Sequence, residues 1–126
     1  MKIFIIAGEP SGDEYGAQLM RELRSINANI SFNGIGGTLM TKEGLKSMAP
    51  FSKMSVMGFV EVLKSLFFFI KLEKKILNHI KQEVPDKIIL IDYPGFNLRL
   101  CKKIKSITEI KIIYYISPQI WAWKEK

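Results

Sequence analysis

Three short runs in the sequence are apolar at almost every position, and they constrain the fold more than any other feature. They are "KIFIIA" at residues 2–7, "KIILI" at residues 87–91 and "KIIYYI" at residues 111–116. A strand that is apolar on both faces must be covered on both faces, which is typical of parallel sheets between layers of helix. The segments between the runs carry apolar residues at helical spacing. The expected fold class is therefore α/β, a parallel sheet with helices on both faces.

Strands and helices are expected to alternate along the chain. Apolar residues at every fourth position, as at Leu72, Ile76 and Ile80, predict the longest helix, and Pro85 ends it. The expected order is strand 2–8, a helix that includes 19–26, strand 30–37, short helix 38–43, short strand within 45–51, helix 56–84, strand 87–91, a helix that includes 100–107, and strand 111–117.

Length and charge limit the classes of function. A chain of 126 residues suits one domain. Residues 1–63 hold 6 Lys/Arg and 6 Asp/Glu, whereas residues 64–126 hold 13 and 6, so the excess positive charge lies in the second half. Such a half can meet nucleic acid, an anionic membrane or a phosphorylated substrate. With only Cys101 and His79 available, no metal, cofactor or internal disulfide is expected.

Three loops follow strands of the expected sheet. They are "GEPSGD" at residues 8–13, "DYPGFN" at residues 92–97 and "SPQIWAW" at residues 117–123. Ligands of parallel sheets bind outside the carboxyl ends of the strands, where such loops open a crevice. We therefore expect the polar residues of these loops to converge on one edge of the sheet.

The first loop is not a nucleotide-phosphate motif, and its carboxylates would repel a phosphate. One interpretation is a capping box, with Ser11 as N-cap and Glu14 three residues later. Glu9 precedes the helix and is available to a sugar hydroxyl. For the loop as a whole we expect substrate contacts from Glu9, Ser11, Gly12 and Asp13.

The second loop places a carboxylate, Asp92, at the end of a buried strand. One interpretation is an Asx-type turn that binds backbone N–H groups. The other is a general base, which Tyr93 and Phe96 would partly desolvate and whose pKa they would raise. Asn97 either caps the next helix or orients a ligand. In the third loop, Gln119 is placed to contact a sugar hydroxyl.

The segment 54–72 is too apolar for an ordinary amphipathic helix. Thirteen of its 19 residues are Met, Val, Phe, Leu or Ile, and residues 66–70 are apolar at five consecutive positions. One stripe toward a core cannot use them all. Glu61, Lys64 and Lys71 argue against a membrane span. The lysines at 64, 71, 74 and 75 favour contact with an anionic membrane surface over a protein partner.

A basic face is expected on the helix after "DYPGFN". Arg99, Lys102 and Lys103 lie three and four residues apart, which places them together. They form either a solvated face or a contact for phosphate. Because no aromatic residues are interleaved with them on this helix, nucleic acid is not the expected partner.

Four motifs in order resemble the amino-terminal domain of the lipid-A-disaccharide synthase family. They are "AGEPSGD" at 7–13, "VMGFVEVL" at 56–63, "DYPGFN" at 92–97 and "YYISPQIWAWK" at 114–124. The resemblance implies a Rossmann-like domain, the first half of a two-domain B-type glycosyltransferase. It also implies an inverting reaction of UDP-2,3-diacylglucosamine with 2,3-diacylglucosamine 1-phosphate, with Asp92 as base. The implied membrane contacts are Val60, Val62, Leu63, Leu66, Phe69 and Ile70.

The resemblance also implies a second domain that binds most of the UDP and is absent from residues 1–126. We therefore expect this polypeptide to be inactive alone, either as a truncated or split gene product or as one half of an enzyme completed by a separate chain. The implied location is the cytoplasmic face of the inner membrane of a Gram-negative bacterium, as a peripheral protein. The alternative function is a non-catalytic module that binds lipid or membrane.

Overall fold

The computed structural model describes residues 1–49, 51 and 59–116, without the side chains of residues 59–65. Strands and helices alternate as the sequence predicts, which confirms the α/β class. The elements are β1 (Lys2–Ala7), α1 (Pro10–Ile26), β2 (Ser31–Ile35), α2 (Thr38–Lys42), β3 (Leu45–Ser47), α3 (Phe59–Glu83), β4 (Lys87–Ile91), α4 (Pro94–Ile107) and β5 (Ile112–Tyr115).

The five strands form one parallel sheet in the order β3-β2-β1-β4-β5. The chain builds outward from β1 to β2 and β3, then crosses to the other side of β1 to add β4 and β5. This order is Rossmann-like, and its direction changes between β1 and β4. Sheets of this type bind their ligands at such a switch point, outside the carboxyl ends of the two strands.

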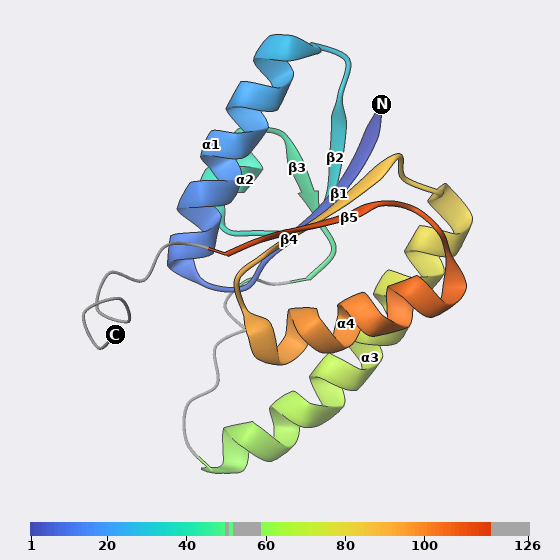
Figure 1. The fold of residues 1–126 in the computed structure, drawn as a ribbon. Coiled ribbons are helices and arrows are strands. Elements are labelled where there is room, and N and C mark those ends of the chain that lie inside the picture. The colour runs from blue at the N-terminus through green and yellow to red at the C-terminus, as the bar shows by residue number, and fades with distance from the viewer. Residues whose placement is uncertain (50, 52–58, 117–126) are drawn as a thin grey trace, which may run out of the picture.

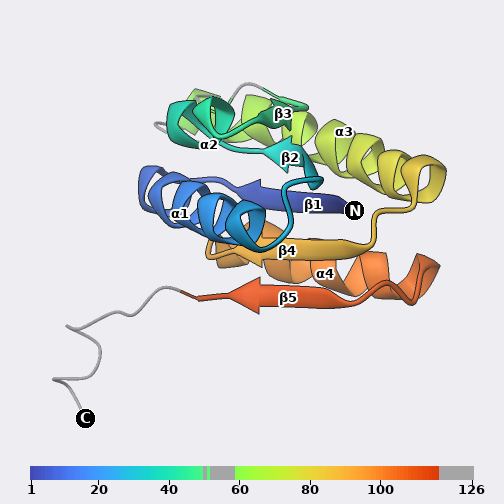
Figure 2. The ribbon, with the colours of Figure 1, turned by 90° about the horizontal axis from the view of Figure 1, so that it is seen from above.

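Helices cover both faces of the sheet, with α1 and α2 on one face and α3 and α4 on the other (Figures 1 and 2). Successive residues of β1 alternate between the two layers. Phe4 and Ile6 pack in the core cluster with α3 and α4, while Ile3 and Ile5 pack with α1 and α2. Because both faces are covered, the strand is buried at nearly every position. This burial on both faces explains why the strand is a continuous apolar run in the sequence.

One position in β2 requires glycine. Gly34 has φ of +146°, a conformation that L side chains rarely adopt, and it pairs with Ile5 of β1. A Cβ atom at Gly34 would lie 1.8 Å from the carbonyl oxygen of Ile5. No side chain can be accommodated at that distance, so β1 and β2 approach each other only because residue 34 has none.

The expected capping box at the start of α1 is wrong. The helix begins at Pro10, its N-cap is Glu9, and no side chain bonds to the cap position. Proline suits the first helical position because its ring fixes φ near the helical value and the missing N–H needs no partner there. Ser11 therefore lies inside the first turn and is exposed, as is Glu14.

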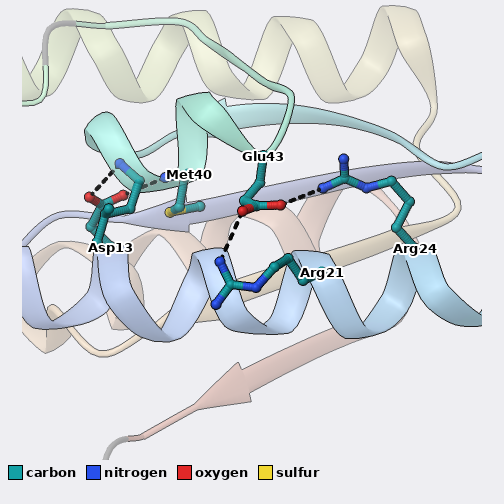
Figure 3. A network of polar contacts seen from close by, with 6 residues as sticks. Asp13, Arg21, Arg24, Met40 and Glu43 are labelled. Carbon is teal, nitrogen blue, oxygen red and sulfur yellow. Dashed lines mark hydrogen bonds and ion pairs between the residues drawn. The ribbon is translucent and has the colours of Figure 1, made fainter.

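Asp13 joins α1 to the amino end of α2 (Figure 3). It is only 6% exposed, and its carboxylate oxygens accept hydrogen bonds from the backbone N–H groups of Gly37, Leu39 and Met40 at 2.8, 3.1 and 3.0 Å. These N–H groups have no partner within their own helix turn. A side chain from a different helix thus caps α2.

We expect Asp13→Ala to lower the free energy of unfolding by about 2–3 kcal/mol, because two buried N–H groups and one part-buried N–H group lose a charged acceptor. Urea unfolding of residues 1–126 measures the change. Glu14→Ala, which removes an exposed carboxylate from the next position of the same helix, is the matched control and is expected to change stability by less than about 0.5 kcal/mol. Equal effects of the two variants would show that the cap contributes nothing.

A second contact holds the other end of α2. The carboxylate of Glu43, the residue after α2, accepts hydrogen bonds from the guanidinium groups of Arg21 and Arg24 on α1, at 2.9 and 3.2 Å (Figure 3). Together with Asp13, these pairs attach α2 to α1 at both of its ends. The layer on this face is therefore fixed next to the loop that follows β1.

Candidate functional site

The loops after β1 and β4 meet at the switch point of the sheet. A Cβ atom at Gly8 would lie 2.7 Å from ring carbons of Tyr93, so the tyrosine ring lies directly against the backbone of Gly8. Beside them, the rings of Tyr15 and Tyr115 at the end of β5 are 5.6 Å apart. The expected convergence of the first two loops is confirmed. The third loop, with Gln119, lies outside the described residues.

An open groove of about 340 Å³ begins at this meeting point and runs between α3 and the start of α4. We call it the α3–α4 groove. Its lining is mainly apolar and aromatic, with charged groups from three different elements. The lining residues are Glu9, Leu66, Phe69, Ile70, Glu73, Tyr93, Pro94, Gly95, Phe96 and Arg99. Such a groove suits a ligand that is apolar over most of its length and polar at one end.

Three aromatic rings form one wall of the groove. The ring of Phe69 lies 5.4 Å from that of Phe96 and 6.4 Å from that of Tyr93, and the last two are 6.2 Å apart. Centroid distances of this size are those of packed aromatic pairs. Phe69 is half-buried and contacts the core, whereas Leu66 and Ile70 are 52% and 40% exposed.

A buried carboxylate connects α3 to α4 at the groove. The side chain of Glu73 is 8% exposed, and its oxygens pair with Arg99 Nε at 3.2 Å and with the ammonium group of Lys103. Two of the three residues in the expected basic face of α4 therefore have a carboxylate partner. The sequence gives no local sign of this pair, because Glu73 lies 26 residues before Arg99 and no pattern around it indicates burial.

Glu9 and Tyr93 form a polar end of the groove. Burial raises the pKa of the Tyr93 phenol, and the nearby carboxylate of Glu9 raises it further. The phenol therefore keeps its proton at neutral pH and is a hydrogen-bond donor. With Glu9 as an acceptor beside it, this end can bind hydroxyl groups of a ligand.

Asp92 is half-buried where β4 ends, in an unusual backbone conformation. Asp92 and Tyr93 have φ values of 43° and 50°, both in the left-handed region. For residues other than glycine this costs about 1–3 kcal/mol each and is found where the surrounding structure enforces it. The backbone N–H of Asp92 donates to the carbonyl oxygen of Tyr115 on β5 at 2.8 Å. The groove lining includes Tyr93 to Phe96 but not Asp92, which lies beside it.

Asn97 is fully buried, and its role in the turn is structural. Its side-chain amide donates to the carbonyl oxygens of Ile91 and Asp92, at 3.2 and 2.9 Å. Asn97 does not cap α4, whose N-cap is Tyr93, so that interpretation of the sequence is wrong, whereas contact of Asn97 with a ligand stays a prediction. Asn97 fixes the end of β4 from inside the following helix.

The remaining expected site residues are distributed over several environments. Gly12 is buried, and a Cβ atom there would lie 3.2 Å from the Cβ of Ala7, so α1 packs closely on the sheet. Gly12 and Asp13 thus have structural roles, and substrate contact by them or by exposed Ser11 stays a prediction.

Of the six expected membrane contacts, Leu66, Phe69 and Ile70 line the groove, while the side chains of Val60, Val62 and Leu63 lie outside the described residues.

No helix in the described part of the chain has the length and hydropathy of a membrane-spanning segment. In the same residues, no three His, Cys, Asp or Glu side chains are grouped as ligands for a metal ion.

Comparison with known proteins gives consistent matches along nearly the whole chain. A family model described as lipid-A-disaccharide synthetase matches residues 3–126. A lipid-A-disaccharide synthase from Trichlorobacter lovleyi is 47% identical over 98% of this chain and 32% of its own length. One from Pseudomonas fluorescens is 44% identical over 100% and 33%, and lipid-A-disaccharide synthase 1 from Legionella pneumophila is 42% identical over 99% and 33%. The chain therefore spans about a third of the length of these relatives.

Proposed function

This chain belongs to the lipid-A-disaccharide synthetase family, and we propose on that premise that it forms the acceptor- and membrane-binding part of a lipid A glycosyltransferase. The reaction joins UDP-2,3-diacylglucosamine to 2,3-diacylglucosamine 1-phosphate and releases UDP. The observation that carries this proposal is the position of Asp92, half-buried at the switch point and directly beside an apolar groove. The remainder of the cleft, which binds the UDP, comes from protein outside residues 1–126.

In the proposed mechanism Asp92 is the general base. Its carboxylate takes the proton of the acceptor hydroxyl, and the hydroxyl oxygen forms a bond to the anomeric carbon of the donor sugar with inversion. The bond from that carbon to the UDP oxygen breaks, and UDP leaves with the electron pair. Because the leaving diphosphate is already stable as an anion, no second carboxyl group is needed to protonate it, unlike in glycoside hydrolysis.

The α3–α4 groove is the proposed site for an acyl chain of the acceptor. Its apolar lining from Leu66, Phe69 and Phe96 suits a hydrocarbon chain, and Glu9 suits the hydroxyl groups of the sugar at the end of the groove. An acyl chain in this groove would place its sugar next to the loop that carries Asp92.

The exposed side of α3 is the proposed membrane contact. Leu66, Phe67 and Ile70 are 52%, 68% and 40% exposed, and Lys71 and Lys74 on the same helix are exposed as well. An apolar surface flanked by lysines suits binding at the interface of an anionic bilayer. The proposed location is the cytoplasmic face of the inner membrane.

We expect replacement of Leu66, Phe67 and Ile70 by serine to reduce binding to liposomes that contain 30% anionic lipid by about tenfold or more. Full insertion of an apolar side chain of this size contributes about 1.5–3 kcal/mol of transfer free energy, and partial insertion contributes a fraction of that. Serine removes this contribution at each position. Flotation of residues 1–126 with liposomes measures the bound fraction. Ile26→Ser is the control, since Ile26 is 83% exposed but lies at the end of α1 on the opposite face. Unchanged flotation of the triple variant would point to a protein partner for this surface.

Activity is best tested in a chimaera in which residues 1–126 replace the matching third of the Trichlorobacter lovleyi relative. The expected result is formation of the acylated disaccharide and release of UDP, whereas residues 1–126 alone bind the acylated acceptor without turnover. A folded chimaera that binds lipid but makes no disaccharide would favour the alternative, a lipid-binding module.

A further inference from the structure

The carbonyl oxygen of Asp92 accepts two hydrogen bonds from different elements. The phenol of Tyr114, on β5, donates to it at 2.8 Å, and the side-chain amide of Asn97, on α4, donates at 2.9 Å. A carbonyl oxygen has two lone pairs, so both are occupied. The N–H of the same residue donates to Tyr115. The polar backbone atoms of Asp92 are thus all bonded to the elements on either side of the turn.

These bonds act on a part of the chain that has an unfavourable conformation by itself. Asp92 and Tyr93 are both left-handed, and φ and ψ decide where the side chain of Asp92 points. Without the two donors, the turn is expected to relax toward commoner backbone conformations, which would redirect the carboxylate. The phenol bond differs from the others because it comes from a side chain of the edge strand, 22 residues later in the chain.

We propose that Tyr114 is a positioning residue, whose hydroxyl group, together with the Asn97 amide, holds Asp92 in the backbone conformation that directs its carboxylate to the acceptor hydroxyl. This role rests on the proposed function of Asp92 as base. Tyr114 is half-buried, and burial followed by the carboxylate of Asp92 and the thiol of Cys101 raises the pKa of its phenol. The hydroxyl group therefore remains a donor across the neutral pH range.

The first test is catalytic and uses the chimaera. Tyr114→Phe removes one hydroxyl group and is expected to lower kcat about tenfold to 100-fold, the range of a small displacement of a reacting group, with the KM of both substrates within twofold. Ser25→Ala, which removes an exposed hydroxyl group near the far end of α1, is the control and is expected to keep wild-type kcat. An unchanged kcat of Tyr114→Phe would overturn the proposal, as would a loss confined to KM.

A double variant tests whether Tyr114 acts through Asp92. In a background that already carries Asp92→Ala, Tyr114→Phe is expected to cause no further loss of kcat, because there is no carboxylate left to position. A second, multiplicative loss would show that the hydroxyl group acts independently, which contradicts a positioning role.

A third measurement separates failure of this inference from failure of the proposed function. Amide hydrogen exchange of residues 1–126 reports the turn itself, and Tyr114→Phe is expected to speed exchange of the Asp92 N–H at least tenfold while the amides of β1 stay protected. Unchanged exchange at Asp92 would show that the phenol does not hold the turn. Faster exchange together with full activity of Asp92→Ala would instead refute the proposed base.

Discussion

Replacement of Asp92 by asparagine or alanine in the chimaera is expected to lower kcat at least 100-fold. A general base contributes about 10²–10⁴-fold to rate, and neither variant can take the proton of the acceptor hydroxyl. Asparagine is the sharper substitution because it keeps the shape of the side chain and tolerates the left-handed conformation that residue 92 adopts. Release of UDP with saturating substrates measures the loss.

The control for this prediction is Glu109→Ala. Glu109 is exposed and lies in the connection between α4 and β5. This connection is at the amino end of β5, whereas the switch point is at the carboxyl ends of the strands. Wild-type turnover is expected for it. If the Asp92 variants kept more than a third of the wild-type kcat, the base would have to be another group, and Asp92 would serve the turn alone.

The second large effect is on stability. Gly34→Ala is expected to lower the free energy of unfolding by at least about 4 kcal/mol, which is a large part of the stability of a domain of this size. The new Cβ atom would start 1.8 Å from the carbonyl oxygen of Ile5, and alanine is also strained at φ of +146°. Relief would require β1 and β2 to separate at the centre of the sheet. Urea unfolding, or the loss of soluble chain, measures the effect.

Gly95→Ala is the matched control for Gly34→Ala. A Cβ atom at Gly95 meets no atom within 4 Å, and the residue lies in the first turn of α4, where alanine is favoured over glycine. Its stability is expected to stay equal or to rise by up to about 1 kcal/mol. Equal losses in the two variants would mean that the close approach of β1 and β2 is not what requires glycine at position 34.

The layers of the fold could be predicted because the physical cause of the pattern is local. A strand with helices on both faces has no solvent-facing side, so β1 and β4 read as continuous apolar runs, and no distant contact is needed to recognise them. The ends of elements were less predictable. Ser11 and Glu14 have the right spacing for a capping box, but the preceding proline moved the start of α1 back to Pro10.

The position of the candidate site was also predictable, since the loops after parallel strands must share one edge of the sheet. Its internal contacts were not. The Glu73 pairs with α4 and the Tyr114 bond to Asp92 join residues that are more than 20 positions apart, and their sequence neighbours give no sign of a partner. Nor does any local pattern show that Asp13 is buried under α2, because an acidic residue in the first turn of a helix is common on the surface.

The length of α3 has a consequence for handling the protein. The helix has 25 residues and is about 37 Å long, whereas the six residues of β1 span about 20 Å, so the sheet cannot cover it from end to end. Its amino-terminal half extends past the edge of the sheet in Figure 1, and Leu66 and Phe67 lie on that half with most of their surface in water. At high concentration, the purified protein is therefore expected to self-associate through the exposed amino-terminal half of α3, and mild detergent is expected to reverse this association.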